Sequence, residues 1–177
     1  MVRVHVICEG QTEEMFVKEL LQPEFFPKGI YLNPMLVGKP GHKGGNFKLE
    51  RLFTDVRNHL LSDRTSYCTT FFDFYGLPTS FPGKSTAADL TDIESKAETV
   101  REALYQALAE KLGDEAMRRF IPFVQMYEFE LEDLVVVDRE QGDTVFKRLN
   151  REDFATWLED YTLGELWQKN ILGGRPS

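Results

Sequence analysis

Hydrophobic and polar positions follow two different periods along most of the chain. Residues 2–9 (VRVHVICE) are rich in β-branched side chains and predict a strand. The next segment, GQTEEMFVKELL, spaces Phe16, Leu20 and Leu21 as one side of a helix. Thr12 is expected to cap this helix, because a hydroxyl side chain can accept a hydrogen bond from an N–H of the first turn. The chain is therefore expected to open with a strand, a turn and a helix.

Two further strands and a second helix are predicted before residue 74. Residues 30–38 (IYLNPMLVG) have strand composition, although Pro34 weakens the prediction because it lacks an N–H. A glycine-rich loop then leads into a predicted helix whose apolar side carries Leu49, Leu52, Phe53, Val56 and Leu60. Residues 66–73 (SYCTTFFD) form an apolar run that ends on Asp73 and predict a third, buried strand.

The strongest helical pattern lies in the second half of the chain. Its apolar stripe, with residues three or four apart, consists of Ile93, Ala97, Val100, Leu104, Leu108 and Leu112. Thr91 and Glu94 have the spacing of a capping box, and Gly113 is placed to end the helix. Residues 120–126 (FIPFVQM) predict a fourth strand, which Pro122 assigns to a sheet edge.

Strands that alternate with helices predict an α/β fold built from βαβ units with right-handed crossovers. We expect a mostly parallel sheet of order 2-1-3-4, flanked by helices. Residues 133–177 are less regular and predict two short strands and two short helices. The chain is thus expected to form a single domain, with a core of residues 1–132 and a small α+β appendage of residues 133–177 packed on it.

Carboxylates follow three of the predicted strands. Glu9 ends the first strand, Asp73 ends the third, and Glu128 and Glu130 follow the fourth. In the order 2-1-3-4 these strand ends are neighbours, at the edge where open parallel sheets bind ligands. Single acids at strand ends are common because strand ends meet solvent, but several that converge repel one another. A hard cation such as Mg²⁺ or Mn²⁺, bound by oxygen ligands, would offset that repulsion, so a shared metal or phosphate site is expected.

A glycine-rich basic loop follows the second strand. Its sequence, VGKPGHKGGNFKLER, includes Lys39, His42 and Lys43, and its glycines let the backbone approach a ligand closely. The loop is a candidate phosphate cradle at the start of the next helix, although it lacks the P-loop motif. A solvated connection between strand and helix is the alternative interpretation. The other two histidines, His5 and His59, are expected to have packing or surface roles.

Composition narrows the function classes. The 177 residues are 42% hydrophobic, which suits one compact domain with a substantial core. No apolar run is long enough to span a bilayer and no signal-peptide pattern is present, so a cytoplasmic protein without membrane association is expected. Cys8 and Cys68 lie in apolar strands without metal-ligand spacing and are interpreted as reduced core thiols. The net charge of −8 argues against a broad nucleic-acid-binding surface, so any such contact would be local, metal-bridged or assisted by a partner.

Three segments in order, ICEGQTEEMFV, FFDFYGLP and FIPFVQMYEFE, resemble the Toprim-like proteins. The resemblance covers residues 1 to about 130 and is to a prokaryotic family of unknown function related to the nuclease domains of OLD proteins. It implies a Rossmann-like Toprim fold, an acid-base glutamate after the first strand and a DxD pair that binds Mg²⁺ after the third. Glu9 matches the glutamate and Asp73 the first aspartate.

Tyr75 stands where the second aspartate of the DxD pair would be. The phenol could hydrogen-bond a phosphate while Glu128 or Glu130 supplies the missing carboxylate. Alternatively, the site has lost catalysis.

The sequence leaves three functions open. The first is a Mg²⁺-dependent nuclease or phosphoryl-transfer enzyme on nucleic acid, with Glu9 and Asp73 as catalytic residues and metal ligands. A role in a defence system, with a partner such as an ATPase, rests on the resemblance. The second is a non-catalytic module that binds a nucleotide or a protein partner. The third is a phosphatase with Asp73 as the nucleophile, which the absence of a second nearby acid disfavours.

Overall fold

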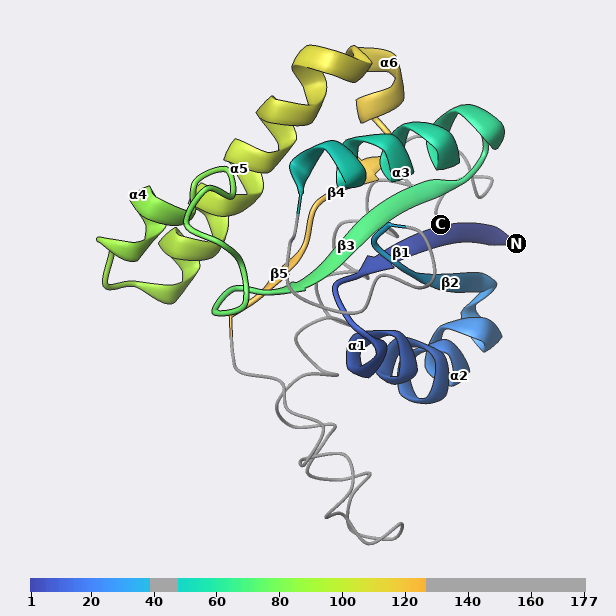
Figure 1. Ribbon diagram of the computed structural model, residues 1–177. Helices are drawn as coiled ribbons and strands as arrows, with labels where there is room; N and C mark the ends of the chain where they lie inside the picture. The colour runs from blue at the N-terminus through green and yellow to red at the C-terminus, as the bar shows by residue number, and fades with distance from the viewer. Residues whose placement is uncertain (39–47, 127–177) are drawn as a thin grey trace, which may run out of the picture. The chain divides into compact units, whose positions relative to one another are not determined.

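The computed structural model describes residues 1–38 and 48–126, which fold as a parallel sheet with helices on both faces (Figure 1). The strands are β1 (Val2–Cys8), β2 (Ile30–Leu36), β3 (Tyr67–Asp73), β4 (Phe120–Ile121) and β5 (Val124–Gln125). Their order is β2-β1-β3-β4, with β5 also paired to β3, and each of these pairings is parallel. The α/β class, the Rossmann-like parallel sheet and the order 2-1-3-4 are thereby confirmed.

A helical segment follows β1 and covers one face of the sheet (Figure 1). It consists of α1 (Gln11–Phe16), a π-helical turn (Val17–Leu21), α2 (Gln22–Phe25) and a 3-10 turn (Phe26–Lys28). The cap prediction at Thr12 is wrong, because Gly10 occupies the N-cap and its N–H donates to Oε2 of Glu13 at 2.9 Å. The π-helical turn lies just before Pro23, whose nitrogen cannot donate the bond that would continue a regular α-helix.

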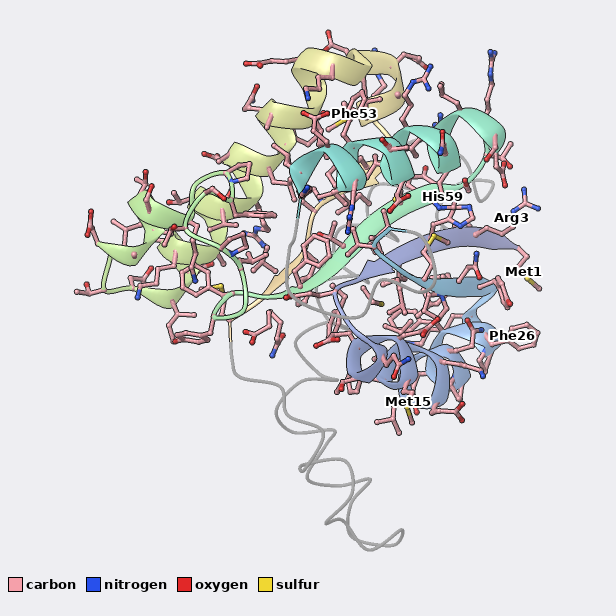
Figure 2. All side chains as sticks on the ribbon, viewed as in Figure 1. Met1, Arg3, Met15, Phe26, Phe53 and His59 are labelled. Atoms are coloured by element: carbon pink, nitrogen blue, oxygen red, sulfur yellow. The ribbon has the colours of Figure 1, made fainter. Side chains whose placement is uncertain are left out.

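Aromatic side chains join this segment to the sheet. Phe16 of α1 stacks on Phe71 of β3, and Phe71 stacks on Phe123, with centroids 5.6 Å apart in both pairs. All three rings are buried. Met15 and Phe26 lie on the outer side of the segment, where about half of each side chain is exposed (Figure 2).

The opposite face carries α3 (Leu49–Ser62), α5 (Ile93–Leu112) and α6 (Asp114–Met117), with the short α4 (Lys84–Ala88) before α5. The core between these helices and the sheet includes Ile7, Leu52, Val56, Leu60, Cys68, Phe72, Val100, Leu104 and Leu108. The predicted end of α5 at Gly113 is confirmed, but its N-cap is not. Asp92 is the N-cap and its side chain accepts from the Ser95 N–H at 2.8 Å, in place of the predicted Thr91. Ile93, predicted in the buried stripe, is 46% exposed.

The fourth predicted strand is broken at Pro122. Phe120–Ile121 and Val124–Gln125 pair separately with β3, so the prediction of one continuous edge strand is corrected to two short ones. Thr70 bridges the break with its hydroxyl group, which donates to the Phe123 carbonyl at 2.7 Å and accepts from the Phe123 N–H at 3.0 Å. A side chain thus replaces the ladder bonds that the proline interrupts.

At the other edge, β2 contains Pro34 and pairs with β1. The N–H of Leu32, two residues earlier, donates to Oε1 of Gln22 at 2.6 Å. Both positions therefore lack a free donor for pairing with a further strand, which is how natural sheets protect an edge.

Cys8 and Cys68 are free and fully buried, as predicted for core thiols. Burial raises the pKa of both thiols, and the charges of Glu13 and Glu14 add to the rise at Cys8. The two cysteines are therefore neutral at physiological pH and are packing residues.

The chain divides into two units, Met1–Glu128 and Phe129–Ser177. The predicted appendage of residues 133–177 lies outside the described residues. Within residues 1–38 and 48–126, no helix has both the length and the apolar character required to cross a bilayer.

Candidate active site at the carboxyl ends of β1 and β3

Glu9 and Asp73 lie at the same edge of the sheet. Glu9 directly follows β1, Asp73 is the last residue of β3, and the parallel register pairs Cys8 with Phe71. The chain's N-terminus lies at the opposite end of β1, where the parallel strands begin (Figure 1). The structure therefore brings together the two acids that the sequence predicts as the centre of the site.

The Glu9 carboxyl group is held in an unfavourable environment for a charge. Its Oε2 atom is buried and has no hydrogen-bond partner among the described residues. Burial raises the pKa of Glu9, and the nearby charges of Glu13 and then Asp73 raise it further, while a hydrogen bond from the Asp73 backbone opposes the rise. Glu9 thus keeps its proton to a higher pH than an exposed glutamate does.

Glu13 is a third acid of this site that sequence reasoning did not identify as functional. Its side chain is 9% exposed, and its Oε2 accepts the N–H of Gly10. Burial raises the pKa of Glu13, hydrogen bonds from its own backbone and from Gly10 oppose the rise, and the Asp73 charge raises it. The signal in the sequence was its position in the first turn of a helix that starts immediately after Glu9, from which a glutamate can reach back.

The turn after β3 folds over Glu9. Oδ1 of Asp73 accepts the N–H of Tyr75 at 3.0 Å, and the Asp73 carbonyl accepts the N–H of Leu77 at 3.2 Å. This path brings Gly76 against the carboxyl group: a Cβ added there would lie 3.2 and 3.3 Å from the two oxygens of Glu9. A side chain at position 76 would therefore press on this carboxyl group, which would have to move by a few tenths of an ångström.

Tyr75, predicted as a phosphate-binding residue, is 58% exposed. Its ring contacts that of Phe74 edge to face, with centroids 5.4 Å apart, and its backbone N–H is the group that contacts Asp73. The side chain at the second position of the DxD pattern thus supplies an exposed phenol in place of a carboxylate.

Lys84 is a second residue that the sequence did not single out. Its ammonium group donates to the Phe74 carbonyl and lies 3.4 Å from the centroid of the Phe74 ring. Burial lowers the pKa of Lys84, while the charge of Asp73 raises it and that of Lys96 lowers it. Ten residues of Pro/Gly-rich loop separate Lys84 from Asp73, so no local periodicity could indicate their proximity.

The other predicted site residues are Lys39, His42, Lys43, Glu128 and Glu130, and all five lie outside the described residues. In the two described ranges, no group of three or more His, Cys, Asp or Glu side chains is arranged to hold a metal ion. Glu9 and Asp73 nevertheless have the hard oxygen donors that Mg²⁺ prefers, and no described residue satisfies Oε2 of Glu9. They fit two positions of a Mg²⁺ ligand set that further residues would have to complete.

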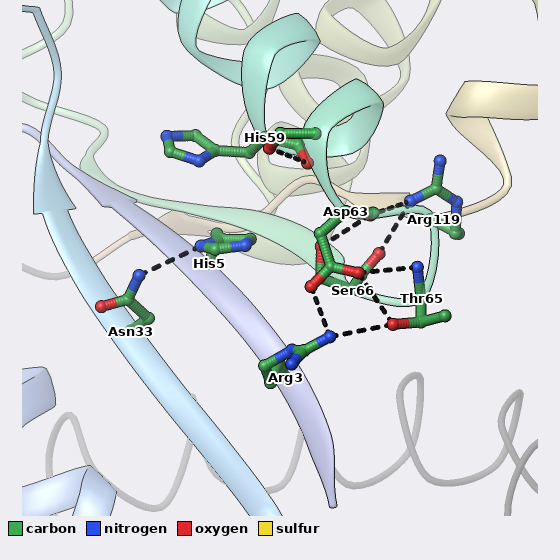
Figure 3. A network of polar contacts seen from close by, with 9 residues as sticks. Arg3, His5, Asn33, His59, Asp63, Thr65, Ser66 and Arg119 are labelled. Carbon is green, nitrogen blue, oxygen red and sulfur yellow. Dashed lines mark hydrogen bonds and ion pairs between the residues drawn. The ribbon is translucent and has the colours of Figure 1, made fainter.

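A separate polar network lies toward the amino ends of the strands (Figure 3). Arg3 forms an ion pair with Asp63 at 2.6 Å and donates to the Thr65 hydroxyl at 3.0 Å. The guanidinium of Arg119 donates to the carbonyls of Leu60, Asp63 and Ser66 at 2.8, 2.9 and 3.0 Å. These contacts join the C-terminus of α3 to the residues that precede β3. We therefore interpret the network as one that stabilises the fold.

The two histidines predicted to have packing or surface roles belong to the same region. The His5 and His59 rings stack with centroids 4.6 Å apart, and Nδ1 of His5 lies 3.1 Å from Nδ2 of Asn33. Burial lowers the pKa of His5, and the charge of His59 lowers it further. Burial also lowers the pKa of His59. Both rings are therefore neutral packing groups near pH 7.

Comparison with known proteins gives a family and no function. No curated protein and no solved structure matches the chain. The profile of one family, described as a domain of unknown function (DUF4276), matches residues 8–151, a range that includes Glu9, Asp73, Lys84 and both acids after the fourth predicted strand. Nothing in this match links the family to Toprim domains or OLD nucleases. The chain belongs to the DUF4276 family.

Proposed function

We propose that this protein is a Mg²⁺-dependent phosphoryl-transfer enzyme that cleaves phosphodiesters of nucleic acid. The observation that carries the proposal is the buried Oε2 of Glu9, which has no hydrogen-bond partner in the described part of the chain and lies close to the charges of Glu13 and Asp73 at the carboxyl ends of the strands. Folding alone disfavours acids so placed, because their charges repel and burial removes solvent. Such arrangements occur where function requires them.

Glu9 and Asp73 would hold the cation, and we propose Glu128 or Glu130 as the residue that completes the ligand set. The cation, when bound, would neutralise charge on the phosphate and lower the pKa of a bound water. The Asx turn between Asp73 and Tyr75 fixes one carboxylate, and the backbone at Gly76 packs against the other. The two acids are thus oriented before a ligand arrives, which reduces the cost of reorganisation.

Glu9 has a second task in this proposal. Its carboxylate is also the acceptor that we propose for the proton of an attacking water, and in the metal-free protein burial and neighbouring charges raise its pKa above that of an ordinary glutamate. Glu13, fixed by the Gly10 N–H, acts on Glu9 through its charge and is a positioning residue. The reaction therefore uses one acid for proton transfer and a neighbour that adjusts its pKa.

The choice of nucleic acid as substrate is supported by the resemblance of the three motifs around Glu9, Asp73 and Glu130 to Toprim-like proteins related to the nuclease domains of OLD proteins. With a net charge of −8, contact with a strand would be local, through basic residues such as Lys39, His42 and Lys43. The same resemblance favours a defence-system component that works with a partner ATPase.

The first test is Mn²⁺ and Mg²⁺ binding by calorimetry, followed by cleavage assays on single- and double-stranded DNA and RNA. Glu9→Gln and Asp73→Asn should each abolish or strongly weaken metal binding, and Glu9→Gln should lower the cleavage rate by about 10²- to 10⁴-fold. Glu19→Gln is the matched control, since that side chain is 64% exposed on the helix after Glu9. Metal binding that persists in both site variants would overturn the proposal. A preference for a phosphate monoester over a diester would instead indicate a phosphatase.

A non-catalytic nucleotide- or partner-binding module is the second candidate. The observation in its favour is the exposed phenol of Tyr75 at the position of the second DxD acid, which supplies no metal ligand. This alternative predicts that the full-length protein binds an oligonucleotide with equal affinity in Glu9→Gln and wild type, and that neither protein cleaves it.

A further inference from the structure

Two lysines converge on one aromatic ring beside the acidic site. Nζ of Lys84 lies 3.4 Å from the centroid of the Phe74 ring, and Nζ of Lys96 lies 6.0 Å from the same centroid. Phe74 directly follows Asp73 and is 4% exposed, so its position is fixed by the core. The lysines come from α4 and from the first turns of α5, and the buried ring holds both near the carboxyl end of β3.

Lys84 and Lys96 differ from Lys111 of α5, whose charge is balanced by a carboxylate. None of the ion pairs among the described residues includes Lys84 or Lys96. Lys111 shows the contrast: it lies 5.0 Å from the ring of Phe53 on α3 (Figure 2) and is also paired with Glu50. Burial and the charge of Lys96 lower the pKa of Lys84, while the charge of Asp73 raises it, so Lys84 lies near one like and one opposite charge. Two ammonium groups placed against one ring, with no ion pair of either among the described residues, are suited to bind an anion.

Each lysine retains hydrogen-bonding capacity for that anion. An ammonium group has three donors, and Lys84 uses one on the Phe74 carbonyl. Lys96 has a ring contact with Phe74 and no hydrogen bond to it, so the packing of Phe74 depends less on this side chain. The half-exposed ring of Tyr75, 5.7 Å from Nζ of Lys84, adds an aromatic surface on which a base can stack.

We propose that Lys84 and Lys96, placed against the ring of Phe74, form a phosphate-binding subsite beside Asp73 that takes a backbone phosphate of a single nucleic-acid strand. The identity of the ligand rests on the proposed function, whereas binding of the phosphate requires neither the metal nor cleavage. The subsite would offset the repulsion between a polyanion and the acids at Glu9 and Asp73. It also supplies a strand contact that does not depend on the basic loop predicted from the sequence.

The test is binding of a fluorescent single-stranded DNA 12-mer to the full-length protein, measured by anisotropy in EDTA over a series of salt concentrations. Lys96→Gln should weaken binding several-fold and reduce the slope of log affinity against log salt by about 0.7, the value for one lost contact with a single strand. Lys96→Arg should retain the slope because it keeps the charge. Lys111→Gln, on the same helix, is the matched control and should leave the slope unchanged. A structural role of Lys96 would not produce this pattern.

Three results would overturn the subsite: no binding in EDTA, equal slopes for Lys96→Gln and wild type, or equal losses for Lys96→Gln and Lys111→Gln. Lys84→Gln should reproduce the slope change, and a thermal melt identifies any loss that comes from releasing the Phe74 carbonyl. The proposed function fails separately. DNA binding that depends on the lysines, without metal binding or cleavage, would support the subsite and refute the enzyme. Metal-dependent cleavage, with DNA binding by Lys96→Gln equal to that of wild type, would support the enzyme and refute the subsite.

Discussion

Thr70→Val tests whether a side chain carries the sheet across Pro122. Thr70 is fully buried, and its hydroxyl group makes two hydrogen bonds, to the carbonyl and the N–H of Phe123. Valine has nearly the same shape, so the substitution removes both bonds without opening a cavity. The change therefore isolates hydrogen bonding from packing.

The expected cost follows from the burial of both backbone groups. Removing one partner of a buried hydrogen bond costs about 1–3 kcal/mol, because the remaining group has lost its water as well. Two such bonds at Phe123, which is 6% exposed, give an expected loss of about 3 kcal/mol in the free energy of unfolding. Valine adds β propensity and apolar character, which keeps the estimate near the lower half of the range.

Urea denaturation followed by circular dichroism measures this loss, with an unchanged m-value as a check on the transition. Thr69→Val is the matched control: Thr69 is equally buried in the same strand, but its hydroxyl donates one longer bond, 3.3 Å, to the Thr70 carbonyl. It should cost about 1 kcal/mol or less. Equal losses in the two variants, or a Thr70→Val protein as stable as wild type, would refute the bridging role.

Three further predictions concern other parts of the fold. Arg119→Ala should lower the free energy of unfolding by about 2–4 kcal/mol, because three charge-assisted bonds to carbonyls are lost, and Arg119→Lys should recover only part of this loss in the same denaturation assay. Gly76→Ala should cost about 1 kcal/mol and weaken Mn²⁺ binding in calorimetry, since the added methyl group presses on the Glu9 carboxyl group; unchanged binding would contradict this. The pKa of both His5 and His59 is lowered on folding, so the unfolded chain binds more protons below about pH 6.5 and stability should fall as the pH drops through that range. His59→Gln should show a shallower fall in Tm between pH 7.5 and 5.5, and equal slopes would refute the assignment.

The parts of the fold that follow local periodicity could be predicted from the sequence. The alternation of strand and helix patterns predicted a parallel sheet, and with the expected order 2-1-3-4 the rule for ligand binding at strand ends placed Glu9 and Asp73 together. Caps were predicted less well, because adjacent residues compete for the same role. Asp92 lies next to the predicted Thr91, and only the observed hydrogen bond to Ser95 distinguishes them.

The missed site residues depend on geometry that no local pattern records. Glu13 follows the usual preference of acids for a first helical turn, and its contact with Gly10 and its influence on Glu9 appear only when the turn after β1 is folded. Lys84 reaches Phe74 across a loop whose path is fixed by turns, proline and glycine. Contacts between residues far apart in the sequence can be identified only from a structure. The residues at which the strands end can be predicted from the sequence.

The ionised carboxyl group of Glu9 should lower the free energy of unfolding. Burial and the charges of Glu13 and Asp73 hold the pKa of Glu9 above its value in the unfolded chain. The folded protein therefore binds more protons than the unfolded chain between these two pKa values, and the stability present at low pH is lost as the pH rises through the folded value. Glu9→Gln, which is neutral at every pH, should accordingly be more stable than wild type at pH 8 and gain little at pH 4. Urea denaturation at the two pH values measures the difference, with Glu19→Gln as the exposed control. If the variant is less stable than wild type at pH 8, the Glu9 carboxylate stabilises the fold. The inference that this acid is retained for function, although it lowers stability, would then fail.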